Sequence, residues 1–300
     1  MNEIIDRINK LKKEREAIIV AHIYQPPEIQ DIADFVGDSL DLSRKAATTD
    51  AKTIVFCGVK FMAETASILS PQKMVLLPEI EAGCPMADMI DAAKVIALKE
   101  QYKNHKVISY VNTTAQVKAQ SDICCTSANA LDIVKSVEGD IIFVPDRNLG
   151  AYIEKQSGRK MKIANGFCPT HNNFILPDFI IKAKKEHPNA CVLAHPECRP
   201  EVIELADFAM STGQMCKYVK ESPKNEFIIG TEIGIIYRLQ KDNPQKKFYP
   251  VNALAICPNM NKINLAKVAA ALLENKNIIK VDENISKKAY LPIKKMLELS

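Results

Sequence analysis

The sequence has little of what marks several common functional classes. No apolar run approaches the roughly 18 residues that a membrane-spanning helix needs. The phosphate-binding patterns GxxxxGK[ST] and GxGxxG are both missing, and only 10 glycines leave little room for a dinucleotide-binding loop. No CxxC pair occurs, which argues against a zinc ribbon or a thioredoxin-type site. The sequence therefore gives no indication of a membrane span, a nucleotide loop or a zinc ribbon.

The composition is that of a soluble globular protein, with 47% apolar and 25% charged residues. The net charge of +4 is small, and the lysine-rich stretches fall on expected helices, so a solvated surface explains them better than nucleic-acid binding. The opening MNEIIDRINKLKKERE reads as a charged amphipathic helix and not as a signal peptide. We expect a cytoplasmic protein with neither a nucleic-acid nor a membrane partner.

Three stretches of the chain resemble one another. AHIYQPPEIQDIADFVGDS, from Ala21, matches AHPECRPEVIELADFAMST, from Ala194, without a gap, and a fainter copy, SYVNTTAQVKAQSDICCTS, begins at Ser109. Short β-rich runs such as AIIVAH and TIVFCG alternate with helical stretches, which is typical of parallel strands joined by crossover helices. We therefore predict an α/β fold of three pseudo-symmetric repeats, each a small parallel sheet between helices in a three-layer αβα arrangement. The expected domains are residues 1–84 with 270–300, residues 85–172, and residues 173–269.

Each repeat ends in a lone cysteine followed by a proline. Cys84, Cys168 and Cys257 lie 84 and 89 residues apart (168 − 84 and 257 − 168), close to the period of the repeat. Duplication of a stable unit explains repeated core residues, but it does not explain a cysteine just past the last strand of every copy. Three repeats closing around a pseudo-three-fold axis would bring these thiols together in a metal or cluster site at the centre.

Three thiolates on one centre leave one coordination position open. In a [4Fe-4S] cluster the fourth iron would then act as a Lewis acid, and in a zinc site a water would fill the fourth place. The spacing does not separate these two alternatives, since thiolates suit both metals. The other six of the nine cysteines are expected to be mostly buried small apolar residues, with an ancillary disulfide left open.

Polar residues also recur at equivalent positions of the three repeats. Pairs that follow the first strand of each repeat should converge on one crevice, because α/β folds place ligands at the carboxyl ends of their strands; they are His22 and Tyr24, Tyr110 and Asn112, and His195 and Glu197. Hydroxyls stand five residues after an aligned aspartate, at the start of an expected helix, and they are Ser39, Ser127 and Thr212. Such hydroxyls either cap their helices or help the helix N-termini to bind anions.

These motifs together resemble the quinolinate synthase family over essentially the whole chain. The segments that carry the resemblance are AHIYQPPEIQDIADFVGDSLDLS, Tyr110-Val-Asn112, CTSANA, GFCPTH, AHPECRPEV, TEIGIIYRL and CPNM. The resemblance implies three α/β domains around a [4Fe-4S] cluster held by Cys84, Cys168 and Cys257 with one open iron. It also implies the reaction, in which iminoaspartate condenses with dihydroxyacetone phosphate and loses phosphate and two waters to give quinolinate, for NAD biosynthesis.

The resemblance further implies which residues surround the substrates. The expected substrate-binding positions are His22, Tyr24, Ser39, Tyr110, Val111, Asn112, Ser127, His195, Pro196, Glu197, Ser211 and Thr212. Among them we expect Glu197 to be the main base, with Tyr110, His195 and His22 positioning substrate and relaying protons. An aspartate oxidase or an aspartate dehydrogenase is an expected functional partner, as the source of iminoaspartate.

Two other function classes remain open from the residues alone. One is a zinc-dependent aldolase or hydrolase that acts on a small phosphorylated or dicarboxylate substrate through the same three cysteines. The other is a non-catalytic dicarboxylate-binding module in which the cysteines are packing residues. Metal content separates the first from a cluster enzyme, and the ligand affinity of a triple cysteine variant tests the second.

Overall fold

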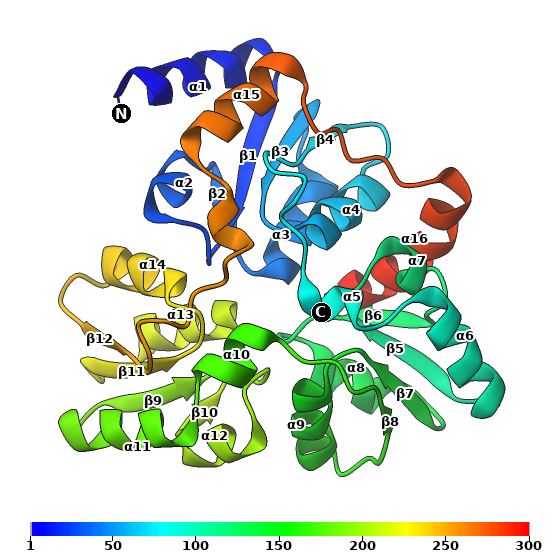
Figure 1. Cartoon of the computed structure of the whole chain (residues 1–300), viewed down its shortest axis with the longest axis vertical. Coiled ribbons are helices and arrows are strands. Elements are labelled where there is room, and N and C mark those ends of the chain that lie inside the picture. The colour runs from blue at the N-terminus through cyan, green and yellow to red at the C-terminus, as the bar shows by residue number, and fades with distance from the viewer. Residues whose placement is uncertain (1, 300) are drawn as a thin grey trace.

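The structure, a computed structural model, describes residues 2–299, and the strands in this range form three separate four-stranded sheets. Figure 1 shows the sheets as three lobes around a common centre. The first sheet holds β1 (Ala17–His22), β2 (Phe35–Gly37), β3 (Thr53–Cys57) and β4 (Met74–Leu76). The second holds β5 (Lys106–Tyr110), β6 (Ile123–Cys125), β7 (Ile141–Val144) and β8 (Lys162–Ile163). The third holds β9 (Cys191–Ala194), β10 (Phe208–Ala209), β11 (Glu226–Gly230) and β12 (Lys247–Pro250).

All three sheets share one topology. The strand orders are β2-β1-β3-β4, β6-β5-β7-β8 and β10-β9-β11-β12, and every pairing is parallel. In each repeat the chain starts in an inner strand, moves to one edge, returns past the start and finishes at the other edge. The predicted threefold repetition of a parallel α/β unit is thus confirmed.

An aspartate fixes the register of the edge strand in every repeat. The carboxylates of Asp34, Asp122 and Asp207 accept the backbone N–H of Ile19, Val107 and Val192, at 2.8, 2.8 and 2.7 Å. The backbone N–H of each aspartate in turn donates to the carbonyl of the same strand residue. This double link returns the chain to the first strand and explains why the aspartate recurs 15 residues after its partner.

Helices cover both faces of each sheet, as the three-layer prediction requires. On the first sheet, α3 (Ser39–Thr48) and α4 (Lys60–Leu69) pack together, and α1 (Asn2–Glu14) packs with α15 (Leu265–Glu274). On the second, α8 (Ala130–Ser136) packs with α9 (Arg147–Ser157), and α7 (Ala115–Lys118) with α6 (Ala92–Gln101). On the third, α11 (Pro177–Glu186) packs with α12 (Pro200–Leu205), and α13 (Thr212–Glu221) with α14 (Gly234–Asp242). A further short helix, α2 (Pro27–Ile32), contacts α14 across the first and third repeats.

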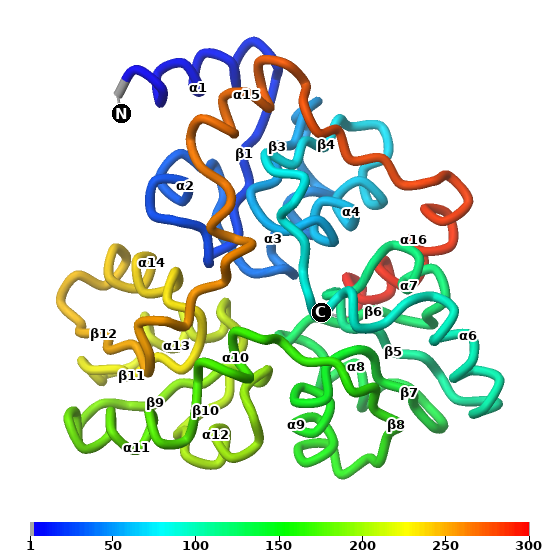
Figure 2. The backbone as a smooth tube through the Cα atoms, in the orientation of Figure 1, coloured from blue at the N-terminus to red at the C-terminus, as the bar shows by residue number. Residues whose placement is uncertain are grey.

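The C-terminal segment joins two repeats. The helix α15 packs on the first repeat, but α16 (Glu283–Glu298) contacts α4 of the first repeat together with β6 and α7 of the second. Figure 2 follows this tube from the top of the molecule towards the second lobe. The expected domain boundaries stay a prediction. The contacts of α16 show that this helix packs on two of the expected domains.

The sequence pattern missed the short edge strands. The strands β2, β6 and β10 are two or three residues long and follow directly after the aligned aspartates. Runs this short carry no readable alternation of apolar and polar residues, and the aspartate that creates them acts through a tertiary hydrogen bond. Across residues 2–299, none of the helices combines the length and the apolar character that crossing a membrane requires.

Candidate active site

The first strands of the three repeats end at one shared cavity. His22 and Tyr110 are the last residues of β1 and β5, and His195 follows β9 directly. All three side chains line a cavity of about 120 Å³ at the junction of the lobes. Residues from the first, second and third sheets therefore meet at the place that the strand-end argument predicted.

Most of the predicted site residues line this cavity. They are His22, Tyr24, Ser39, Cys84, Tyr110, Asn112, Ser127, Cys168, His195, Glu197, Thr212 and Cys257. Three predicted residues lie behind the lining and are buried: Val111, Pro196 and Ser211. The first two are the middle residues of strand-end triplets whose flanking side chains face the cavity, so their place follows from the alternation of an extended chain.

The strand ends of the first and third repeats have the same local geometry. The Nδ1 atom of His22 accepts the backbone N–H of Tyr24 at 3.2 Å, and Nδ1 of His195 accepts that of Glu197 at 3.3 Å. Burial lowers the pKa of each histidine to about 3, against a smaller opposite effect of Glu197. Both rings are therefore neutral at neutral pH, with Nε2 carrying the proton because Nδ1 accepts.

Glu197 has three polar side-chain partners in the cavity. Its Oε1 accepts from the Tyr110 hydroxyl at 2.6 Å and from the Asn112 amide at 3.3 Å, and its Oε2 lies 2.8 Å from Nδ1 of His171. Burial by itself would raise the pKa of Glu197, but His171, His195 and Tyr110 outweigh it and lower the pKa below the ordinary value. Glu197 is therefore a buried, ionised carboxylate held by donors from two other segments.

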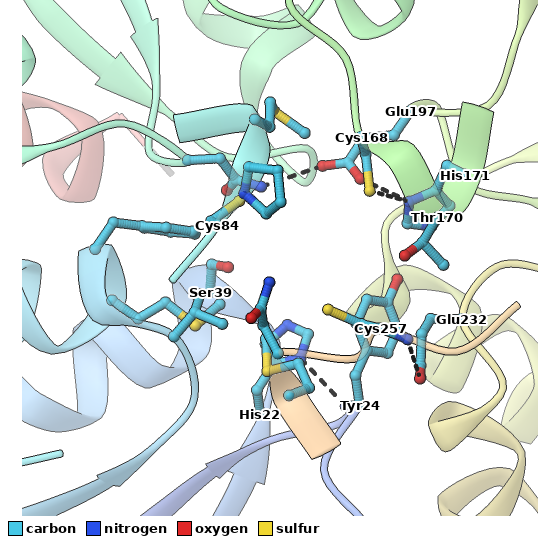
Figure 3. A pocket seen from close by; sticks show the side chains of 18 of the residues that line it. His22, Tyr24, Ser39, Cys84, Cys168, Thr170, His171, Glu197, Glu232 and Cys257 are labelled. Atoms are coloured by element: carbon cyan, nitrogen blue, oxygen red, sulfur yellow. Dashed lines mark hydrogen bonds and ion pairs between the residues drawn. The ribbon is translucent and has the colours of Figure 1, made fainter. Parts of the chain in front are cut away.

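The three predicted cysteine ligands face the same space. Figure 3 shows the side chains of Cys84, Cys168 and Cys257 entering the cavity from three sides, one from each repeat end. None of the nine cysteines is in a disulfide. Of the six others, five are buried and Cys216 is half-buried, as expected of small core residues. Convergence of the three cysteines on one cavity is thus a property of the fold.

Each of these cysteines has the same local setting. Cys84 and Cys168 directly precede the short helices α5 (Pro85–Asp88) and α10 (Pro169–Phe174), and Cys257 precedes the turn η1 (Met260–Lys262). Burial raises the pKa of all three thiols, that of Cys84 to about 12, while backbone N–H groups two or three residues further along oppose the rise. Buried thiols of this kind become thiolates when a metal replaces the proton.

One group of donor atoms already has the spacing of metal ligands. Sγ of Cys168, Nδ1 of His171 and a carboxylate oxygen of Glu197 all lie within 4.8 Å of one another. Cys168 Sγ is 3.2 Å from His171 Nδ1. A sulfur, a nitrogen and an oxygen donor, two of them on buried residues and the sulfur on a half-buried one, form a group that can hold a metal ion.

The helix caps differ from the expected ones. Asp38 caps α3 by accepting from Leu40 and Asp41, and Ser211 caps α13 in a capping box with Gln214. The predicted hydroxyls at Ser39 and Thr212 are the first residues inside those helices, and Ser127 precedes α8 by more than one residue. Capping therefore does not use these three hydroxyls, which line the cavity, where Ser127 Oγ lies 3.2 Å from His195 Nε2.

Several cavity residues were not singled out by residue patterns alone, and the ionisable ones among them are Asp38, His171 and Glu232. Glu232 accepts the backbone N–H groups of Cys257 and Gly234, and burial raises its pKa to about 7. His171 had a usable signal, because it stands three residues after Cys168 and so shares a helix face with it. Asp38 had one too, as an aspartate directly before an expected helix start.

Comparison with known proteins decides between the remaining readings of this cavity. A family model described as quinolinate synthetase A protein matches residues 6–298. The chain is 55% identical over 301 residues to the quinolinate synthase of Thermodesulfovibrio yellowstonii, with 100% of this chain and 99% of the relative covered. It is 52% identical to that of Desulforudis audaxviator, covering 99% of both chains. It is also 51% identical to that of Methanosarcina barkeri, covering 98% of this chain and 97% of the relative.

The chain belongs to the quinolinate synthase family. Membership of the quinolinate synthase family makes it an enzyme, and the central cavity is its candidate active site. This finding does not favour the zinc-dependent hydrolase or aldolase, nor the non-catalytic binding module.

Proposed function

We propose that this enzyme condenses iminoaspartate with dihydroxyacetone phosphate to form quinolinate, releasing phosphate and two waters, in the de novo synthesis of NAD. The observation that carries the proposal is the cavity itself. Three cysteines from equivalent repeat ends and polar residues from equivalent strand ends open onto one space. Family membership over nearly the whole chain supports the same reaction.

The three thiols fit a [4Fe-4S] cluster with one iron that the protein does not bind. The donor set is three cysteines, each of them half-buried and each with backbone N–H groups close to its sulfur. Thiolates with N–H donors around them are the usual ligands of such clusters. When bound, the cluster supplies a Lewis acid at its open iron, which polarises a hydroxyl or carbonyl oxygen.

Glu197 and Tyr110 provide the principal proton-handling pair. The carboxylate is ionised and accepts the Tyr110 hydroxyl at 2.6 Å, so a proton on either oxygen can pass to the other. The low pKa makes Glu197 a weak base while its donors remain in place. It becomes a stronger base when Tyr110 turns its hydroxyl to a substrate oxygen, and the neutral rings of His22 and His195 supply further donors beside it.

Neutral donors must bind the anionic groups of the substrates. The described residues that line the cavity include neither a lysine nor an arginine. Hydroxyls of Ser39 and Thr212 stand on the first turns of α3 and α13, where the helix dipole favours negative charge. The Asp38 side chain already accepts two of the free N–H groups of α3, those of Leu40 and Asp41, so we assign anion binding to the hydroxyls and not to that helix's backbone.

Asn112 has an open acceptor for the substrate. Its Oδ1 is buried and has no hydrogen-bond partner within residues 2–299, while its Nδ2 donates to Glu197. A buried carbonyl oxygen without a partner costs about 1–3 kcal/mol. An N–H or O–H group of a bound substrate, such as the imine N–H of iminoaspartate, would supply the missing donor.

The test is quinolinate formation by the anaerobically purified enzyme. Iminoaspartate, generated in the assay, and dihydroxyacetone phosphate are supplied together and then each is omitted. We expect quinolinate only in the complete mixture, its loss in Cys257→Ala, and near-parental rates in the matched control Cys216→Ala, whose cysteine lies outside the cavity lining. A parental enzyme that carries its cluster yet forms no quinolinate from both substrates contradicts the proposal.

Two further expectations stay predictions. An oxidation of aspartate must supply iminoaspartate, so coupling to an aspartate oxidase or an aspartate dehydrogenase is consistent with the reaction. A cytoplasmic location is expected from the composition alone. Co-purification with such an oxidising enzyme, and cell fractionation, test them.

A further inference from the structure

A buried carboxylate contacts the backbone of the third candidate cluster ligand. Glu232 follows β11 by two residues and is 1% exposed. Its Oε1 accepts the backbone N–H of Cys257 at 3.0 Å, and its Oε2 accepts that of Gly234 at 2.7 Å. Figure 3 shows the bond between Glu232 and Cys257 beside the cavity. One side chain thus joins the end of a strand to the segment that carries a cysteine.

A backbone hydrogen bond recurs just before all three cysteines. In each repeat, a backbone N–H that follows the third strand donates to the carbonyl two residues before the cysteine, at 2.8, 2.8 and 3.0 Å. The donor and acceptor pairs are Lys60 and Ala82, Arg147 and Gly166, and Ile233 and Ala255. The residues directly before the three donors therefore occupy equivalent positions, and they are Val59, Asp146 and Glu232.

Of these three side chains, Glu232 is the one that bonds to its cysteine. Val59 has an apolar side chain that cannot accept a hydrogen bond. The Asp146 carboxylate accepts the backbone N–H groups of Asn148 and Leu149, at the start of its own helix α9. Glu232 is one methylene longer than an aspartate, so one oxygen accepts the N–H two residues further along and the other reaches Cys257.

The segment around Cys257 has less regular structure than the other two cysteine segments. Cys84 and Cys168 each precede a helix whose first residue is a proline, which favours the backbone conformation of a helix start. Cys257 lies between β12 and α15, in a stretch that holds the three-residue turn η1. In this stretch Leu254 is 67% exposed and Ile256 is 39% exposed. Segments with few buried apolar contacts open locally at low cost in free energy, so this one gains most from an added bond.

A glycine makes room for the carboxylate. A Cβ atom on residue 234 would lie 2.8 Å from Oε2 of Glu232 and 2.8 Å from the carbonyl oxygen of Tyr24, closer than Cβ atoms come to such atoms. Because Gly234 has no Cβ, its N–H can reach Oε2, which leaves Oε1 for Cys257. The segment Thr231-Glu-Ile-Gly234 thus has a physical reason for both its glutamate and its glycine.

We propose that Glu232 is a positioning residue for the [4Fe-4S] cluster, whose carboxylate fixes the backbone of Cys257 so that its thiolate is in place to bind iron. The inference rests on the proposed function, because the cluster is part of that proposal. Glu232 acts through the backbone of Cys257, since both of its oxygens accept backbone N–H groups. Hydrogen-bonded partners that orient a metal ligand typically account for about 10–100-fold in metal affinity.

The first experiment measures amide hydrogen exchange in the full-length chain purified without metal. Glu232→Asp keeps the charge and can still accept the N–H of Gly234, but it is too short to reach Cys257. We expect the Cys257 amide to exchange at least about tenfold faster in this variant than in the parent, because its acceptor is lost. The amides of Cys84 and Cys168 should exchange at parental rates, whereas a general loss of stability would speed up all three. An equal rate at Cys257 in parent and variant overturns the inference, and so does a parent whose Cys257 amide is unprotected.

The second experiment measures how long the cluster-loaded enzyme retains its iron. With EDTA in excess and without oxygen, the half-life of bound iron should fall about tenfold in Glu232→Asp. The matched control is Asp146→Asn, an equally small change at the equivalent position of the second repeat, whose carboxylate does not contact a cysteine. Its half-life should stay within about threefold of the parent. A parental half-life in Glu232→Asp, or an equal shortening in both variants, overturns the inference.

Failure of this inference can be told apart from failure of the proposed function. A parental chain that binds no iron contradicts the cluster and with it the proposed function, while the exchange rates of the metal-free chain still decide whether Glu232 fixes Cys257. A parent that carries about four irons and makes quinolinate, but whose Glu232→Asp variant exchanges and retains iron like the parent, overturns the role of Glu232 alone.

Discussion

The first and third repeats place different side chains on the same framework. In both, a histidine at the end of the first strand accepts the backbone N–H two residues later, and burial lowers its pKa to about 3. The residue at that second position is Tyr24 in one repeat and Glu197 in the other. One is a neutral phenol joined to Thr231, and the other an ionised carboxylate that gathers donors from two segments.

This difference teaches how a symmetric fold serves an unsymmetric reaction. The repeated aspartates, strands and cysteines build three equal walls and one shared centre. The side chains at the strand ends then differ, so that each wall contacts a different part of the reacting molecules. The repeated fold determines where the strand-end side chains lie, and the differences among those side chains determine the chemistry of the site.

The largest expected effect is the difference in kcat between variants at Glu197 and at Tyr24, the equivalent position of the first repeat. Glu197→Gln removes the carboxylate, and we expect kcat to fall at least about a hundredfold, within the range of general acid–base catalysis. Tyr24→Phe, at the equivalent position, should lower kcat about tenfold, because it removes a phenol hydroxyl from the cavity lining. Steady-state kinetics on cluster-loaded enzymes measure both. Turnover of Glu197→Gln within about threefold of the parent would show that Glu197 is not the proton acceptor.

Hydroxyls on the cavity wall should affect binding more than turnover. Ser127→Ala and Thr212→Val each remove a neutral donor from a cavity whose described lining has no lysine or arginine. KM should rise about tenfold in each, the cost of about one charge-assisted hydrogen bond, with kcat and iron content nearly unchanged. An unchanged KM in both variants would remove the hydroxyls from the anion-binding role.

The equivalence of His22 and His195 can be tested by the pH dependence of Tm. Their pKa is lowered from 6.5 to about 3, so the unfolded chain binds protons below about pH 6.5 while the folded protein does not. Above that pH the two histidines therefore do not lower the free energy of unfolding. As the pH falls below it, protonation of the unfolded chain lowers the free energy of unfolding. Between pH 7.5 and 5.5 we expect Tm to drop by about 5 °C, from about 1.4 kcal/mol for each histidine.

Variants of the two histidines should show how much of this drop in Tm each ring causes. His22→Gln and His195→Gln should each remove about half of it, and the double variant most of it, since the two rings occupy equivalent places. Differential scanning calorimetry under anaerobic conditions measures all four chains. A double variant with the same acid sensitivity as the parent would mean that these rings do not set it.

The smallest expected effect is on stability, from changes at the aspartate that recurs in all three repeats. Asp34→Asn, Asp122→Asn and Asp207→Asn each replace the carboxylate that accepts a strand N–H. Each should cost about 1 kcal/mol, or about 2 °C in Tm, by a similar amount in all three repeats and without a change in KM. A single site that costs several times more than its counterparts would break the equivalence of the three walls.

Because the repeats resemble one another, most of the fold and many of the site residues could be predicted from the sequence. Strands such as Ala17–His22 and Thr53–Cys57 are apolar runs, and aligned cysteines and strand-end pairs reveal themselves by their period. The alignment can show only what recurs. His171 has no counterpart in the other repeats, where the position three residues after the cysteine holds Ala87 or Met260, so periodicity could not find it.

Other features escaped because they depend on contacts between distant segments. Thr231 acquires its place from Tyr24 of another repeat, and α16 crosses from the first repeat to the second. Asp38 takes over helix N–H groups that a sequence view assigns to ligands. The local sequence predicts where a helix starts. Whether the N–H groups of that helix start face a carboxylate or a substrate depends on how the three repeats pack together.

The most direct test of the account is an iron and sulfide count on the anaerobically purified protein. We predict a brown protein with about four irons and four sulfides per chain, and loss of both in each of Cys84→Ala, Cys168→Ala and Cys257→Ala but not in Cys216→Ala. A colourless, oxygen-stable enzyme with one zinc per chain, or full iron content after loss of any of the three cysteines, would contradict it.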